Sequence, residues 1–284
     1  WAMMSYTSTS NEYKLEFSKL DIAALQYLYG PSTTARTGDD TYYYDGTSAN
    51  FIWDGGGEDT LSAANSANPV TIYLTPGYWG YGGNAKADTI TSAGQITVNF
   101  GTTIENLTGS DYADTLTGND ANNKIYGGYG DDTIYGGAGN DSLDYSFANG
   151  NDKLYGGLGN DTYYVYSISG SDTFIEYLNE GYDRIFTSIS YSIKNISNIE
   201  YLFSFNSIEE DIELTGNSLN NYIKSSDGNC VIDGGLGSDS AWYSWDYSYD
   251  DCSIYIENGD LKVRKGNGSI DILKNIEYII FSDR

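Results

Sequence analysis

Apolar side chains recur with a period of nine residues in the middle of the chain. Between residues 109 and 165 the eighth position of this frame is filled six times, with one slip of two residues, by Leu116, Ile125, Ile134, Leu143, Leu154 and Tyr163. A helix would need apolar residues three and four positions apart, and glycine pairs such as those in "YGGYGDD" would destabilise it. The period therefore predicts very short strands separated by glycine-rich turns with positive φ angles.

Two nonapeptides make one coil of about 18 residues in such a solenoid, with strands stacked at about 4.8 Å. Position six of the frame carries an oxygen ligand in every repeat: Asp114, Asn123, Asp132, Asp141, Asp152 and Asp161. The coil places Asp114 above Asp132 and Asn123 above Asp141. Two carboxylates about 5 Å apart repel by about 3 kcal/mol at an effective dielectric constant near 20, so a cation has to lie between them.

Calcium suits these ladders because it accepts about six to eight hard oxygens, including carbonyls from glycine-rich turns. The predicted fold class is all-β: a calcium-bound parallel β-roll or β-sandwich solenoid with one short N-terminal helix and a C-terminal β cap. A disordered acidic linker does not explain the fixed apolar position, although we expect disorder when calcium is absent. The predicted turn ligands are Gly128, Gly130, Gly137, Gly139, Gly157, Gly159, Gly235 and Gly237.

The frame returns in a weaker form between residues 216 and 242. Position six is occupied there by Asn221, Cys230 and Asp239, and Asp239 alone belongs to a full motif, "GGLGSDSAW". We expect fewer ions in this block, and we expect Cys230 to be a turn residue without a catalytic role. Residues 166–215 alternate between apolar and polar side chains, which predicts strands of a solenoid with wider coils.

The two ends of the chain depart from the repeat. Asp21 as N-cap and the apolar residues that follow it predict a helix that ends at Gly30-Pro31. Two alternating runs around Asn258-Gly259 predict a hairpin, followed by a strand that ends in "IIF" at Phe281. We expect this C-terminal segment to cap the exposed end of the solenoid.

Composition narrows the possible partners. The 284 residues carry a net charge of −26, which disfavours nucleic acid and anionic lipid, and we find no apolar run long enough to insert into a membrane. Histidine is absent, so the usual general base and zinc ligand are missing. The two cysteines, Cys230 and Cys252, are too few for a disulfide scaffold. They fit either one bridge or two free thiols, and this small number favours free thiols.

The nonapeptide frame resembles the calcium-binding repeat GGxGxDxUx of RTX proteins. Residues 1 to about 165 also resemble the C-terminal part of a serralysin-type secreted metalloprotease, from the Met-turn onward. This resemblance is carried by the segments "MMSY" at residues 3–6, "DIAALQYLYG", "RTGDDTYYY", "WDGGGEDTL" and "TIEN". The first residue is Trp1 and no charged-then-apolar leader follows it, so we expect a processed chain or a part of a longer one.

The serralysin resemblance implies further ligands. Met4 would be the Met-turn methionine and Tyr6 the tyrosine that reaches zinc, although the isolated chain gives Tyr6 no zinc to bind because the family's HExxHxxGxxH motif is absent. One calcium ion would be shared, partly through carbonyls, by Arg36, Asp39, Thr41, Asp54, Gly56 and Asp59. A second ion beside Asp59 would be bound by Thr103 and Glu105.

These interpretations divide the chain into six segments. They are 1–35 (protease-domain remnant), 36–108 (start of a calcium-binding β-sandwich), 109–165 (first RTX block), 166–215 (wider-coil solenoid), 216–242 (second RTX-like block) and 243–284 (cap).

The sequence is compared with three functions for this chain. The first is a non-catalytic calcium-binding RTX region that serves folding and export of a zinc metalloprotease, through the type I secretion apparatus implied by the family, to an extracellular or cell-surface location. The second is a self-assembling surface-layer, filament or adhesin subunit, suggested by aromatic clusters such as "TPGYWGYGG" and "AWYSWDYSYDD". An enzyme within the chain is the third, and it is disfavoured because the paired carboxylates are accounted for as metal ligands.

Overall fold

The computed structural model describes residues 24–25, 27–28, 30, 32, 34–144, 150–166, 172–205, 211–243 and 247–281. The chain divides into two compact units, Trp1–Ile134 and Tyr135–Arg284, which are described separately, and strand β10 (Thr133–Ala138) spans the division. The six segments inferred from the sequence stay a prediction.

The first unit is built from two sheets whose strands are three or four residues long. One sheet has the order β1-β3-β7-β9 and is parallel throughout. The second contains β8-β4-β5-β6-β2, in which β5 runs antiparallel to its two neighbours. The strands are β1 (Thr41–Tyr43), β2 (Asn50–Ile52), β3 (Thr60–Ser62), β4 (Val70–Tyr73), β5 (Gly80–Gly82), β6 (Gln95–Val98), β7 (Asn106–Thr108), β8 (Thr115–Thr117) and β9 (Lys124–Tyr126).

The second unit continues the same architecture with longer intervals between stacked strands. A parallel sheet has the order β11-β13-β15-β17-β19-β21-β25, β12 pairs with β14, and a third sheet follows β16-β18-β20-β24-β23-β22. The strands are β11 (Ser142–Leu143), β12 (Lys153–Leu158), β13 (Thr162–Val165), β14 (Thr173–Ile175), β15 (Arg184–Thr187), β16 (Tyr191–Ser192), β17 (Tyr201–Ser204), β18 (Ile212–Thr215), β19 (Tyr222–Lys224), β20 (Cys230–Asp233), β21 (Ser240–Trp242), β22 (Ser253–Glu257), β23 (Asp260–Arg264), β24 (Ile270–Lys274) and β25 (Tyr278–Ile280).

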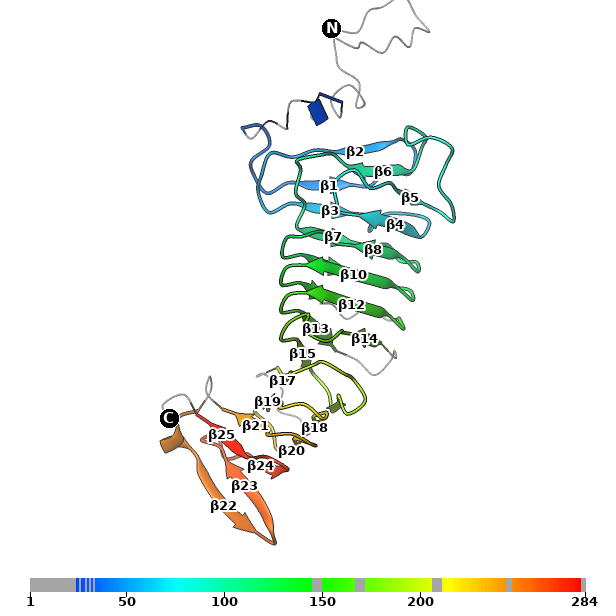
Figure 1. The fold of residues 1–284 in the computed structure, drawn as a ribbon. Coiled ribbons are helices and arrows are strands. Elements are labelled where there is room, and N and C mark those ends of the chain that lie inside the picture. The colour runs from blue at the N-terminus through cyan, green and yellow to red at the C-terminus, as the bar shows by residue number, and fades with distance from the viewer. Residues whose placement is uncertain are drawn as a thin grey trace, which may run out of the picture. The chain divides into compact units, whose positions relative to one another are not determined.

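The core is one side chain thick, as the nine-residue period predicts. Register places Leu107 beside Ile125 in the first unit and Leu143 beside Tyr163 in the second. All six position-eight side chains are completely buried. Figure 1 shows the strands of each unit stacked as successive rungs, such as β3 and β7. The predicted all-β parallel solenoid is therefore confirmed.

The ends of the chain agree with the sequence pattern where they are described. Ala24, Leu25, Tyr27 and Leu28 have helical backbone, whereas the expected N-cap Asp21 lies outside the described residues. Strands β22 and β23 form the predicted antiparallel hairpin, which is orange in Figure 1. Asn258 and Gly259 connect them with φ angles of 57° and 93°, the left-handed pair that a two-residue hairpin turn needs. The 3-10 helix Tyr249–Asp251 was not predicted.

The prediction that Cys230 is a turn residue was wrong. Cys230 is buried as the first residue of β20 because the turn before it ends one residue earlier than the nonapeptide frame indicates. Cys230 and Cys252 are both free thiols. Within the described part of the chain, no helix is long and apolar enough to cross a membrane.

Candidate metal sites

A ladder of hydrogen bonds joins the position-six residues of successive turns. The backbone N–H of Asp114 donates to Asp132 Oδ1 over 2.7 Å, and these residues are 18 positions apart in the sequence. The same bond joins Asp141 to Asp161 over 2.7 Å, and Asn221 to Asp239 over 2.7 Å. The predicted stacking of Asp114 and Asp132 is thereby confirmed. Each bond uses one carboxylate oxygen and turns the other towards the glycine-rich turn.

Several of these second oxygens are buried without a donor. Asp59 Oδ2, Asp161 Oδ2 and Asp239 Oδ2 accept no hydrogen bond. A methyl group on Gly156 would lie 2.4 Å from Asp161 Oδ2, and one on Gly234 would lie 2.6 Å from Asp239 Oδ2. Glycine therefore keeps open the space beside each carboxylate. A buried anionic oxygen with no donor and free space beside it fits a bound hard cation.

The predicted turn glycines have the backbone conformation expected of them. All eight have φ angles between 91° and 132°. Successive turns also lie in close contact, since a methyl group on Gly159 would be 1.7 Å from the carbonyl oxygen of Gly139. These turns hold backbone carbonyls and carboxylates at one edge of the solenoid, which is the donor set that calcium prefers.

The buried carboxyls are costly to ionise in this protein environment. Burial is the main cause that raises the pKa of Asp59, Asp161 and Asp239 to about 6, and that of Asp183 to about 7. Neighbouring carboxylates raise the pKa of each of these groups further. A cation between the turns would favour the ionised carboxylates and so lower these pKa values.

In two predicted ligands, Asp114 and Asn123, the side-chain atoms that would bind a metal already have hydrogen-bond partners in the protein. Asp114 Oδ1 accepts the N–H of Val70 over 2.7 Å, and Asp114 Oδ2 accepts the N–H of Ser110. Asn123 Oδ1 accepts the N–H of Asn119 over 2.7 Å, and its Nδ2 donates to the Glu105 carbonyl over 3.1 Å. In these two turns protein groups make the contacts that an ion would make elsewhere.

Asn221 repeats this arrangement in the second block. Its Oδ1 accepts the N–H of Asn217 over 2.8 Å, and its Nδ2 donates to the Ile199 carbonyl over 3.0 Å. An amide can accept a hydrogen bond from a backbone N–H and donate to a backbone carbonyl without a metal, because it presents a donor and an acceptor on one group. The substitution of Asn for Asp at position six therefore replaces charge by hydrogen bonding.

The N-terminal acidic residues form a separate cluster. Ligand atoms of Asp40, Asp54 and Asp59 lie within 4.8 Å of one another. Asp54 Oδ1 accepts the N–H of Gly56 over 2.7 Å, Asp59 donates its N–H to Glu105 Oε2 over 2.8 Å, and Tyr42 donates to Asp54 Oδ2. The structure thus brings together four of the predicted residues, Asp54, Gly56, Asp59 and Glu105.

Other predicted residues are not among the three clustered carboxylates. Asp39 accepts the N–H of Glu58 over 2.9 Å at an exposed position, Thr103 and Thr41 are exposed, and the Arg36 carbonyl accepts the N–H of Gly55. The sequence interpretation missed Asp40, which adjoins the predicted Asp39. Met4 and Tyr6, the predicted Met-turn and zinc residues, lie outside the described residues.

Asp152 belongs to another cluster that the sequence interpretation did not identify. Its ligand atom lies within 4.8 Å of those of Asp144 and Asp172, and its N–H donates to Asp172 Oδ1 over 3.0 Å. Burial, followed by the charges of Asp152 and Asp172, raises the pKa of Asp144 to about 8. Asp144 has a φ angle of 52° and is buried.

In the C-terminal part the ammonium group of a lysine occupies the place that a metal ion would take in the repeats. Lys265 Nζ donates to the carbonyls of Ser226 and Gly228 over 2.6 and 2.7 Å and lies 2.9 Å from Asp271 Oδ1. The Cys230 N–H donates to the same Asp271 oxygen over 3.0 Å, which repeats the ladder bond of the repeats. The Lys265 and Asp271 side chains are fully buried. An ammonium group therefore takes the two turn carbonyls and the carboxylate that elsewhere surround a candidate ion site.

Comparison with known proteins agrees with this geometry. Residues 108–143, 148–165 and 214–244 match the RTX calcium-binding nonapeptide repeat. The chain contains RTX nonapeptide repeats and is similar to serralysins over part of its length. It is 31% identical over 135 residues to serralysin B of Dickeya chrysanthemi, covering 40% of this chain and 27% of that protein. It is 37% identical over 103 residues to serralysin of Proteus mirabilis, covering 31% and 20%.

The metallopeptidase AprA of Pseudomonas marginalis is 31% identical over 135 residues, with 38% of this chain and 27% of that protein covered. The chain thus spans about a quarter of the length of these relatives. RTX repeats and serralysins belong to secreted, extracellular protein families. The RTX nonapeptide is a calcium-binding repeat, so this β-roll region is a calcium-binding one, and its buried acidic groups are compatible with that cofactor.

Proposed function

We propose that this calcium-binding β-roll is the C-terminal folding and secretion part of an extracellular, serralysin-like zinc metalloprotease. The observation that carries the proposal is the ladder of buried carboxylates in which Asp161 and Asp239 each keep one oxygen without a donor. Extracellular calcium modules have dissociation constants of about 0.1–1 mM. The chain would therefore stay unfolded in a calcium-poor cytosol, leave through the type I secretion apparatus and fold outside the cell.

The ions would be bound by carboxylates of one turn and carbonyls of its neighbours. In the repeats we assign this role to Asp132, Asp141, Asp152, Asp161 and Asp239 with the eight turn glycines. In the N-terminal sandwich we assign it to Arg36, Asp39, Thr41, Asp54, Gly56 and Asp59, with Thr103 and Glu105 at a second ion. Asp114 and Asn123 remain assigned, but each would have to exchange hydrogen bonds described above for a metal bond.

The test is the calcium dependence of the fold. In calcium-free buffer at pH 7.5 we expect the circular dichroism of the chain to lose most of its β signal, because unneutralised carboxylates oppose closure of a core only one side chain thick. Millimolar calcium should restore the signal, whereas equal magnesium should restore much less. An identical β signal with and without calcium would contradict the proposal.

The same experiment at pH 5 supplies an internal control. The folded-state pKa values of about 6 to 7 for Asp59, Asp161, Asp183 and Asp239 lie above the unfolded value of about 3.9. The folded chain then binds more protons than the unfolded chain, so its metal-free stability is present at low pH and is lost as the pH rises through 6 to 7. Some β signal should thus return at pH 5 without calcium, while calcium affinity falls.

The protease activity would reside outside these residues. The chain has no histidine, so the zinc motif HExxHxxGxxH has to come from another part of the protein. The residues that precede Trp1 in the full gene product decide this point. A zinc motif there supports the protease, and a surface-layer or adhesin sequence there supports assembly.

Self-association is a second candidate function, favoured by a row of aromatic side chains in the second unit. Tyr164, Tyr166, Phe186 and Phe205 are half-buried and stacked, with ring centroids 5.2–6.3 Å apart. Such a face can bury apolar area against a second copy. Light scattering of the calcium-loaded chain should then show a mass that rises with micromolar concentration, and Tyr166→Ser should reduce it. A constant monomer mass would exclude this function.

A further inference from the structure

Three carboxylates meet at the turn that follows the first RTX block. Ligand atoms of Asp161, Glu176 and Asp183 lie within 4.8 Å of one another. Asp161 precedes β13, Glu176 follows β14 and Asp183 precedes β15, so neighbouring rungs of the second unit bring them together. Their exposed fractions are 0%, 6% and 1%. Two oxygens on one calcium ion at about 2.4 Å lie at most about 4.8 Å apart, which this cluster satisfies.

Glu176 does not belong to the nonapeptide repeat. The residues that match the repeat are 108–143, 148–165 and 214–244, so Glu176 lies between two matched segments. Leu154 pairs with Phe174 and Tyr155 with Ile175, so Glu176 follows in register with Gly156, the first glycine of the preceding turn. A methyl group on Gly156 would lie 2.2 Å from Glu176 Oε1. The glutamate side chain therefore extends into the space that Gly156 leaves open, and brings a carboxylate to a place where the repeats have glycine.

The protein supplies only part of the partners that this cluster needs. Asp161 Oδ1 accepts the N–H of Asp141, Asp183 Oδ1 accepts the N–H of Asp161 over 2.7 Å, and Glu176 Oε1 accepts the hydroxyl of Tyr163. Asp161 Oδ2 and Glu176 Oε2 are buried and accept no hydrogen bond. The adjacent Arg184 makes no hydrogen bond through Nε, and its charge lowers the pKa of Asp161 by less than burial raises it.

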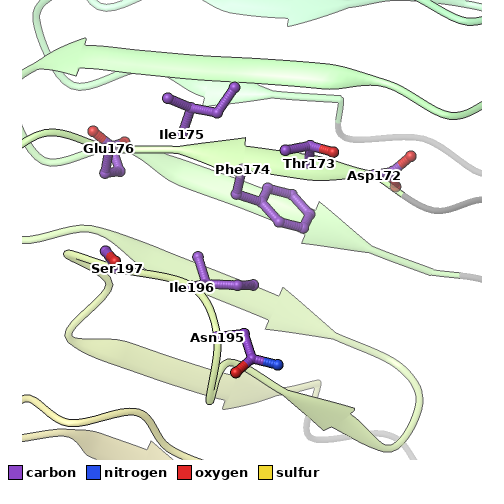
Figure 2. Close-up of a pocket in the computed structure, with 8 residues that line it drawn as sticks. All are labelled: Asp172, Thr173, Phe174, Ile175, Glu176, Asn195, Ile196 and Ser197. Atoms are coloured by element: carbon purple, nitrogen blue, oxygen red, sulfur yellow. The ribbon is translucent and has the colours of Figure 1, made fainter.

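Glu176 also borders a pocket in the second unit. The pocket has a volume of 330 Å³ and is lined by residues of β14 and by Asn195, Ile196 and Ser197. Figure 2 shows Asp172 and Glu176 at opposite ends of β14, with Asn195, Ile196 and Ser197 on a separate loop. The buried glutamate therefore lies at the edge of a pocket.

We propose that Asp161, Glu176 and Asp183 form a calcium site that shares Asp161 with the repeats, binds its ion through three carboxylates and holds the end of the first RTX block to the wider coils. Three anionic ligands make calcium binding tighter than two, because ligand charge sets affinity in oxygen sites. The site rests on the proposed calcium-dependent fold and adds to it a ligand set that the nonapeptide motif does not encode.

The test is the number of calcium ions bound by the whole chain, measured by native mass spectrometry at saturating calcium. Glu176→Gln keeps the size of the side chain and an acceptor for Tyr163 but removes the charge. We expect this variant to bind one ion fewer than the wild-type chain. Glu213→Gln on the exposed position of β18 makes the same charge change and should bind the wild-type number.

A second variant distinguishes the loss of a calcium ligand from a folding defect. Asp183→Asn should lose the same single ion, and the double variant with Glu176→Gln should also lose one ion and not two. Circular dichroism in calcium should show that all variants keep their β signal.

Two outcomes have different meanings. A wild-type chain that binds no calcium would overturn the proposed function. A wild-type chain that binds calcium while Glu176→Gln keeps the full number of ions would overturn this site alone. In that case protons would neutralise the cluster, because the pKa of Glu176 is raised to about 9 in the buried metal-free cluster. Glu176→Gln would then leave the tightest calcium-binding step unchanged.

Discussion

Lys265→Met is expected to destabilise the C-terminal part of the chain by about 3–5 kcal/mol, the usual cost of removing one partner from a buried ion pair. The variant leaves the Asp271 carboxylate buried without its cation, and it removes the donor to the carbonyls of Ser226 and Gly228. Tyr243 and Ser225 still donate to Asp271 Oδ2, over 2.8 and 2.7 Å, but neither carries a charge. Urea unfolding in saturating calcium measures the loss.

Lys262→Met is the matched control for this variant. Lys262 pairs with Glu257 over 2.7 Å at the surface of the same hairpin, where Glu257 is 58% exposed. Exposed pairs are screened by solvent and contribute little to stability, so this variant should unfold close to the wild-type urea concentration. Hydrogen exchange should place the Lys265→Met effect in β20, β23 and β24. Equal losses from both variants would show that Lys265 does not act as an internal cation.

Gly159→Ala is expected to destabilise the first RTX block by about 2–6 kcal/mol, which adds backbone strain to a steric clash. Gly159 has a φ angle of 132°, a conformation that alanine rarely adopts. Its new methyl group would lie 1.7 Å from the Gly139 carbonyl oxygen, so the stacked turns would have to separate. The separation should also weaken calcium binding, because ligands of one ion come from neighbouring turns. Thermal unfolding at several calcium concentrations measures both effects.

Gly56→Ala is the control that separates backbone strain from the steric clash between turns. Gly56 has nearly the same φ angle, 135°, but a methyl group there would meet no atom within 4 Å. We expect a loss of about 1–3 kcal/mol from strain alone. If Gly56→Ala and Gly159→Ala were equally destabilised, contact between stacked turns would contribute nothing measurable to the stability of the roll.

The acidic turns of this chain are compensated in three ways. In the first RTX block the carboxylates keep oxygens for an ion, as Asp161 does. Further along the chain Asn221 uses its amide, and beyond it Lys265 provides an ammonium group. Stability of the C-terminal residues should consequently depend less on calcium than stability of the repeats. Hydrogen exchange of β22 to β24 at low calcium provides a direct comparison.

The architecture of the rungs follows from the sequence pattern alone. Every position-eight side chain from Leu116 to Tyr163 is buried, the turn glycines have positive φ angles, and Asn258-Gly259 forms the hairpin turn. These features depend on steric limits within a few residues and on a short apolar period. Local interactions of this kind can be predicted from a single sequence.

Only the tertiary structure decided which acidic residues keep an oxygen for an ion. Asp114 and Asp161 occupy the same position in the repeat, yet Val70, 44 residues away, donates to Asp114, while Asp161 Oδ2 has no donor. Glu176 meets Asp161 because its strand lies in register with Gly156, and Lys265 reaches Ser226 across 39 residues. Hydrogen bonding and charge compensation depend on contacts between distant residues, and the nine-residue period carries no information about those contacts.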